Sequence, residues 1–169
     1  TVINTNDAAV ITGTDTGAVS EDVGVVADTI STSGSLNVTD PDAGQSSFQA
    51  QTLAGTYGSL TIDTAGNWSY SADNTQAAIQ QLDATESLTD TITVSSFDGT
   101  THDVLITIHG TEDDSVIGGT ATGSVTEDGT LTASDTLTIT DVDSNDNPVN
   151  FNDLASTATT YGSFAMSAN

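Results

Sequence analysis

Residues 7–22, DAAVITGTDTGAVSED, show how the chain is organised, because residues 113–128, DDSVIGGTATGSVTED, repeat them without a gap. Two later stretches return in the same order. SLNVTDPD at 35–42 comes back as TLTITDVD at 136–143, and TYGSL at 56–60 comes back as TYGSF at 160–164. Self-similarity over one domain length indicates tandem modules. The sequence therefore predicts a complete module over residues 1–111 and the N-terminal part of a homologous module over residues 112–169. We expect this second part to be either truncated or completed by another segment.

The charge of the chain is unusual for a folded protein. It has 24 acidic residues and no Lys or Arg, which gives a formal net charge of −24. No carboxylate can pair with an ammonium or guanidinium group of the chain, so the folded state carries self-repulsion that bound cations or salt must relieve. Nucleic acid and anionic membranes are disfavoured partners because both bind basic surfaces. With no cysteine there are no disulfides or thiolate metal sites. No apolar run approaches the roughly 18 residues of a membrane span.

Short alternating runs broken by Gly, Asn and Asp predict an all-β fold, a tandem immunoglobulin/cadherin-like β-sandwich. In the run 47–53 we expect Phe48, Ala50 and Thr52 to share one face. Good helix formers within 74–82 predict one or two helical turns. Asp98-Gly99 suits a hairpin turn. Strands are expected at 9–11, 17–20, 35–39, 47–53, 57–63, 68–70, 89–97 and 102–109.

Several motifs in a fixed order resemble one known family, the VCBS repeat. They are VSED at 19–22, GSLNVTDPDAG at 34–44, YGSLTID at 57–63 and GNWSY at 66–70, followed by DTITV at 90–94, DGT at 98–100 and ITIHGTED at 106–113. The resemblance implies cadherin-like sandwiches strung in tandem in very large bacterial surface adhesins of the RTX type. It also implies type I secretion to an extracellular, cell-surface location, Ca²⁺ binding, and a role in adhesion or biofilm formation.

Acidic residues in loops are the candidate metal ligands, because Ca²⁺ takes about 6–8 oxygen ligands from carboxylates and carbonyls. The resemblance suggests that the early Glu, the loop after the helical turn, the linker and the following Asp-x-Asp loop meet between two modules. The predicted ligands of this junction are Glu21, Asp83, Glu86, Asp113, Asp114, Asp141 and Asp143. By the same logic Asp40 and Asp42, with Asn6 and Asp7, face a preceding module. The alternative is that these acids are solvated loop residues.

Other kinds of site are weaker in this sequence. Residues 141–148 alternate oxygen side chains like the start of an EF-hand loop, but position six is Asp146 and position twelve is Asn152, where Gly and Glu are required. His102 and His109 lie seven apart and so face opposite sides of one strand, which argues against an enzyme. Trp68 and Tyr70 could stack a sugar in a ligand-binding adhesin module, although core packing explains them more simply. The predicted function is a calcium-rigidified structural repeat, not an enzyme. Its expected partners are neighbouring repeats and calcium ions, and a strand-complemented dimer is an open alternative.

Overall fold

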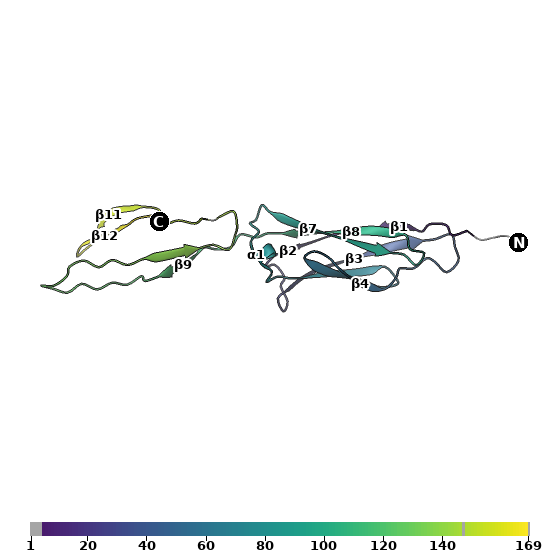
Figure 1. The fold of residues 1–169 in the computed structure, drawn as a ribbon, viewed down its shortest axis with the longest axis horizontal. Coiled ribbons are helices and arrows are strands. Elements are labelled where there is room, and N and C mark those ends of the chain that lie inside the picture. Colours follow the sequence, from purple (N-terminus) through teal and green to yellow (C-terminus); the bar gives the residue numbers. More distant parts are fainter. Residues whose placement is uncertain (1–4, 147, 169) are drawn as a thin grey trace. The chain divides into compact units, whose positions relative to one another are not determined.

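The computed structural model of the protein describes residues 5–146 and 148–168. The chain divides into two compact units, Thr1–Thr111 and Glu112–Asn169. Almost all regular structure is strand, as the alternating runs predict, and Figure 1 shows the elements. The first unit contains β1 Val10–Gly13, β2 Thr16–Ser20, β3 Thr29–Thr39, β4 Gln51–Ala54, β5 Gly58–Ile62, β6 Asn67–Asp73, α1 Ala77–Gln80, β7 Ser87–Ser95 and β8 Thr101–His109. The second contains β9 Val116–Gly119, β10 Leu137–Thr140, β11 Leu154–Ala158 and β12 Ser163–Met166.

The first unit is a sandwich of two sheets. One sheet has the strand order β1-β3-β6-β5-β4, and the other has β2-β8-β7. Within the second sheet β2 runs parallel to β8, whereas β7 and β8 form the antiparallel hairpin expected around Asp98-Gly99. Gly99 has φ 92°, the left-handed conformation that such a turn requires. The single turn α1 buries Ile79 against the core.

The core lies between the two sheets and follows the period-two alternation of the strands. Trp68, Tyr70 and Ala72 of β6 are buried, as are Val104, Ile106 and Ile108 of β8. The hairpin register pairs Ile92 with Val104, and Val94 with His102. The buried side chains of β6, β7 and β8 belong to one core cluster, which fills the layer between the two sheets.

Two expectations about the strands are corrected. The long strand β3 begins at Thr29, although the sequence indicated a strand only from residue 35. Its first half is rich in Ser, Thr and Gly and resembles a loop, but pairing with β6 holds it extended. The run 47–53 is not one continuous strand, because β4 starts at Gln51 and Phe48 makes only an isolated bridge with Ser96. This break places Phe48 in the core and leaves Ala50 and Thr52 exposed.

One carboxylate lies inside the sandwich and links both sheets. Asp90 of β7 is 1% exposed. Its Oδ1 accepts the N–H of Thr56 at 2.7 Å, and its Oδ2 accepts the N–H groups of Tyr57 and Gly58 at 3.0 and 3.1 Å. The Tyr70 hydroxyl donates to Oδ2 at 3.0 Å. The repeated TYGS motif of the first unit therefore forms a turn whose amides bind a buried carboxylate.

The second unit repeats the strand pairing of the first at equivalent positions. β1 pairs with β3 through Val10↔Thr39, and β9 pairs with β10 through Val116↔Thr140, the corresponding residues of the repeat. Likewise β4 and β5 pair through Ala54↔Ser59, and β11 and β12 through Ala158↔Ser163. Among the described residues of this unit, however, the strands form two separate two-stranded sheets, β10-β9 and β11-β12.

Candidate calcium site

The loop that follows β3 turns its carboxylates toward the start of the first unit. Asp42 Oδ2 accepts the N–H of Asp7 at 2.8 Å, and Asp40 Oδ1 accepts the N–H of Asp42 at 2.7 Å. Asp40 Oδ2 is buried and has no hydrogen-bond partner among the described residues. A buried carboxylate oxygen without a donor is costly unless a cation or a water molecule reaches it.

The loop that follows β10 has the same geometry. Asp143 Oδ2 accepts the N–H of Asp113 at 2.8 Å, and Asp141 Oδ1 accepts the N–H of Asp143 at 3.0 Å. The Ser115 hydroxyl donates to Asp141 Oδ2 at 2.5 Å. These donors, first the Ser115 hydroxyl and then the Asp143 N–H, hold the pKa of the Asp141 carboxyl below its usual value. Asp141 is therefore ionised at neutral pH and available as a metal ligand.

Three carboxylates of the second unit converge beside this loop. One oxygen each of Glu112, Asp143 and Asp146 lies within 4.8 Å of the others. The chain contains no Lys or Arg to balance these charges. Hard oxygen ligands at this spacing suit Ca²⁺, which binds carboxylates at about 2.3–2.6 Å. The donor set therefore fits a calcium ion.

Three of the predicted ligands, all in the first unit, lie near Gly110 and Thr111 at the end of that unit. Glu21 Oε1 accepts the N–H of Thr111 at 2.9 Å. Gly110 donates its N–H to the carbonyl of Glu86 at 3.1 Å. A Cβ on Gly110 would lie only 2.2 Å from the carbonyl oxygen of Asp83, so the chain passes very close to that loop. Glu21, Asp83 and Glu86 thus lie where the chain leaves the first unit.

Comparison with known families agrees with this fold. The family model of the bacterial cadherin-like domain matches residues 6–110. The chain belongs to this family. A comparison with curated protein sequences finds no match. Cadherin-like domains generally bind Ca²⁺ and serve as structural or adhesion modules, not as enzymes.

In this cadherin-like protein only some of the ligands predicted from the sequence lie close to other carboxylates. Asp40 and Asp42, and separately Asp141 and Asp143, occupy equivalent loops. Asp114 is exposed and belongs to no carboxylate group of three among residues 5–146 and 148–168. Glu112 and Asp146 were not among the predicted ligands. Asp146 stands in the segment DVDSND at 141–146, but it lies outside the alternation of oxygen side chains at 141, 143 and 145.

The remaining candidate residues have structural roles in the cadherin-like fold. Trp68 and Tyr70 are 2% and 0% exposed, so neither offers a face to a sugar. His102 Nε2 lies 3.2 Å from Asp15 Oδ2, whereas His109 is exposed on the other side of β8. No helix in the described part of the chain is long and apolar enough to cross a membrane.

Proposed function

We propose that this chain is part of the stalk of a large bacterial surface adhesin of the VCBS and RTX type, exported by type I secretion to the cell surface. In this proposal residues 1–111 are one complete extender module, and residues 112–169 are the first part of the next. The observation that carries the proposal is the recurrence of one loop geometry. In both units the residue three positions before the first strand, Asp7 or Asp113, donates its N–H at 2.8 Å to the second carboxylate of Asp-x-Asp. Repetition of a site along a chain suits a spacer better than a unique binding tip.

Calcium is proposed to stiffen the points where one module follows another. Glu21 and Glu86 of the first module accept the N–H groups of Thr111 and Gly110, and Glu112 follows Thr111 directly in the sequence. We propose Glu21, Asp83 and Glu86 as ligands from the first module, and Asp113, Asp114, Asp141 and Asp143 from the second. Asp40 and Asp42 would serve the preceding junction. Bound Ca²⁺ would supply the positive charge that the chain lacks and so stabilise the folded state by mass action.

Calcium is expected to raise the melting temperature of the chain at constant ionic strength. Extracellular calcium modules have dissociation constants of about 10⁻⁴–10⁻³ M. At tenfold excess over such a value, binding stabilises the folded state by about 1.4 kcal/mol. For a domain of this size, the melting temperature should rise by about 5–10 °C. Differential scanning calorimetry in calcium, magnesium or chelator at one fixed high salt concentration measures the effect. Fixed salt removes simple screening from the comparison.

Removing the second Asp-x-Asp pair is expected to reduce this calcium response. The test variant is Asp141→Asn with Asp143→Asn, and the matched control is Asp28→Asn with Asp103→Asn, which removes the same charge outside the carboxylate groups described above. Isothermal titration calorimetry should show calcium affinity reduced by about tenfold or more in the test variant, because two charged oxygen ligands are lost. Equal loss in both variants, or no calcium-specific rise in the parent chain, would reject the proposed role of calcium.

A further inference from the structure

The strand that follows the entry of the chain into the first unit pairs with the strand from which the chain leaves it. β2 and β8 are parallel, with the register running from Thr16↔Leu105 to Ser20↔His109 (Figure 1). The other strand pairs described in this unit are antiparallel. In a parallel pair the start of one strand and the end of the other lie at opposite ends. Tension applied at the two ends of the unit therefore pulls β2 and β8 past each other along their length.

Backbone hydrogen bonds continue this pairing beyond both ends of β2. The Leu105 N–H donates to the carbonyl of Asp15 at 2.8 Å, and the Glu21 N–H donates to the carbonyl of His109 at 3.0 Å. Alternate residues of a strand face the same partner strand, so two further residues of β2 face β8 between these bonds. A load along the strands strains these bonds together, whereas a load across them breaks one bond after another.

The chain runs from β1 into β2 without turning back. The Thr14 N–H donates to the carbonyl of Ser35 at 2.8 Å, one step beyond the pairing of β1 with β3, and a Cβ on Gly17 would lie 2.9 Å from the Thr32 methyl group. The Trp68 Nε1–H donates to the Thr14 carbonyl at 2.8 Å and holds this crossing in place. Tension on the residues before β1 therefore reaches β2 along its own axis.

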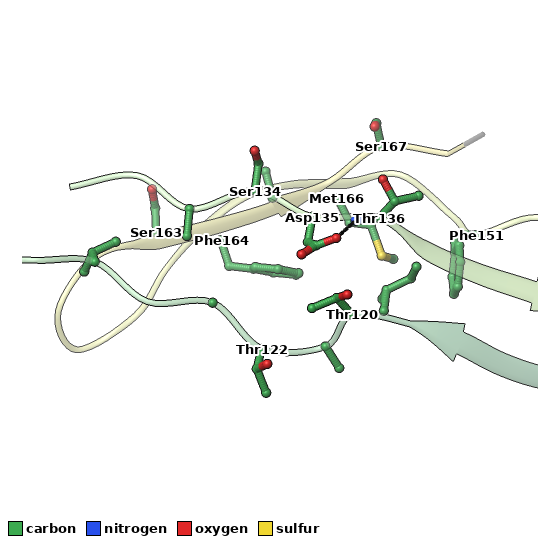
Figure 2. A pocket seen from close by; sticks show the side chains of 16 residues that line it. Thr120, Thr122, Ser134, Asp135, Thr136, Phe151, Ser163, Phe164, Met166 and Ser167 are labelled. Carbon is green, nitrogen blue, oxygen red and sulfur yellow. Dashed lines mark hydrogen bonds between the residues drawn. The ribbon is translucent and has the colours of Figure 1, made fainter. Parts of the chain in front are cut away.

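The internal repeat shows that β2 depends on β8. The β2 sequence TGAVS returns as TGSVT at 122–126, which is in no strand. Among its described residues the second unit has no counterpart of β8. Val19 is 8% exposed, but its equivalent Val125 is 56% exposed and, with Thr122, lines a cavity of about 710 Å³ (Figure 2). Pairing with β8, not local propensity, therefore holds this sequence extended in the first unit.

We infer that the β2–β8 pair, with its two flanking hydrogen bonds, is a mechanical clamp that resists tension along the chain. The inference rests on the proposed function, because a stalk carries load from one module to the next. β1 is loaded in the same direction, since it pairs along β3 from Val10↔Thr39 to Gly13↔Leu36. Forced unfolding is governed by the rate of unfolding and not by the equilibrium stability. The clamp is therefore a property separate from stabilisation by calcium.

The test is single-molecule force spectroscopy on the 169-residue chain in two pulling directions. The chain has no cysteine, so introduced cysteines define the points of attachment. Thr5→Cys with Thr111→Cys loads β2 against β8 lengthwise. Thr5→Cys with Phe97→Cys loads the pair crosswise, because the β7–β8 turn lies beside the entry of the chain, where the Ala9 N–H donates to Asp98 Oδ2 at 3.2 Å. We expect the lengthwise rupture force to be higher by about threefold or more.

Measurements in calcium and in chelator keep this inference apart from the calcium role. A higher lengthwise force in chelator, without any calcium response of the melting temperature, would support the clamp and reject the calcium role. Equal forces in the two directions would overturn the clamp, even if calcium raised the melting temperature.

A pair of proline variants tests the ladder itself. Val19 belongs to the alternate residues that face β8 with Asp15 and Glu21, so Val19→Pro removes one N–H of the clamp. Ala18→Pro is the matched control, because the N–H of Ala18 is directed away from β8 on this edge strand. Val19→Pro should lower the lengthwise rupture force by about a third or more, and Ala18→Pro should leave it nearly unchanged. Equal forces in the two variants would overturn the inference. If Val19→Pro does not fold, the comparison of the two pulling directions gives the answer.

Discussion

Replacing Asp90 by alanine is expected to lower the free energy of unfolding of the first unit by about 3–5 kcal/mol. The substitution removes the acceptor of three backbone N–H groups and of the Tyr70 hydroxyl, all at 2.7–3.1 Å. The Tyr70 hydroxyl stays buried and the three amides stay partly buried without their acceptor, which costs more than the hydrogen bonds themselves contribute. Urea unfolding followed by the fluorescence of Trp68, the only tryptophan, measures the change.

The loss of stability caused by Asp90→Ala is expected to become smaller at low pH. Burial raises the pKa of the Asp90 carboxyl, but the N–H donors of Thr56 and Tyr57 and the Tyr70 hydroxyl lower it further, so its pKa lies below the usual 3.8. A group whose pKa is lower in the folded state stabilises the fold above its unfolded pKa, and this stabilisation is lost as the pH falls through the folded pKa. The difference between parent and Asp90→Ala should therefore be constant near neutral pH and shrink below about pH 4.

A matched variant separates the loss of the Asp90 hydrogen bonds from a general effect of removing one negative charge. Asp103→Ala removes the same charge from an exposed position of β8, where the carboxylate accepts only the Thr93 hydroxyl at 2.6 Å among the described residues. If relief of the net charge of −24 were the only effect of the substitutions, both variants would be slightly more stable than the parent chain. If Asp90→Ala lost no more than Asp103→Ala, the buried carboxylate would have no special role in stability.

The sequence predicted the strands whose apolar residues alternate and missed the interactions that depend on the tertiary fold. Trp68 and Tyr70 show a clear period of two and are buried as expected. The first half of β3 has too few apolar residues to be recognised, because its extended form depends on pairing with β6. Asp90 looks like an ordinary polar strand residue. Only the arrival of the Thr56–Gly58 turn, more than 30 residues away in sequence, explains why a charge is buried there.

The candidate calcium site was predictable to the extent that it repeats within the chain. The two Asp-x-Asp loops occupy corresponding positions of the sequence repeat, and the structure gives both the same hydrogen-bond pattern. Which neighbouring acids approach them could not be read from spacing. Glu112 lies near Asp143 because the antiparallel pairing of β9 with β10 brings the residues before β9 beside those after β10, and Asp146 follows in the same loop as Asp143, whereas Asp114 is exposed.

Placing aspartate at position 34 is expected to destabilise the first unit by about 3 kcal/mol or more. Gly34 lies on the inward-facing side of β3, and a Cβ there would lie 2.5–2.7 Å from carbon atoms of the Trp68 ring. The Trp68 indole is fixed by its own hydrogen bond to the Thr14 carbonyl at 2.8 Å, so it cannot move away without losing that bond. Overpacking and an unpaired carboxylate in the sheet interface both oppose folding. Ser33→Asp, one residue earlier on the exposed face, is the matched control and should change stability by less than about 0.5 kcal/mol.

A double-mutant cycle with Trp68→Ser shows whether the clash is specific. In the parent chain, Trp68→Ser leaves a cavity and should cost about 3–5 kcal/mol. After Gly34→Asp the ring is already displaced, so the same substitution should cost less by about 1–3 kcal/mol. Urea unfolding followed by far-ultraviolet circular dichroism suits all four chains, since it needs no tryptophan. Additive effects would mean that aspartate at this position tolerates the indole ring.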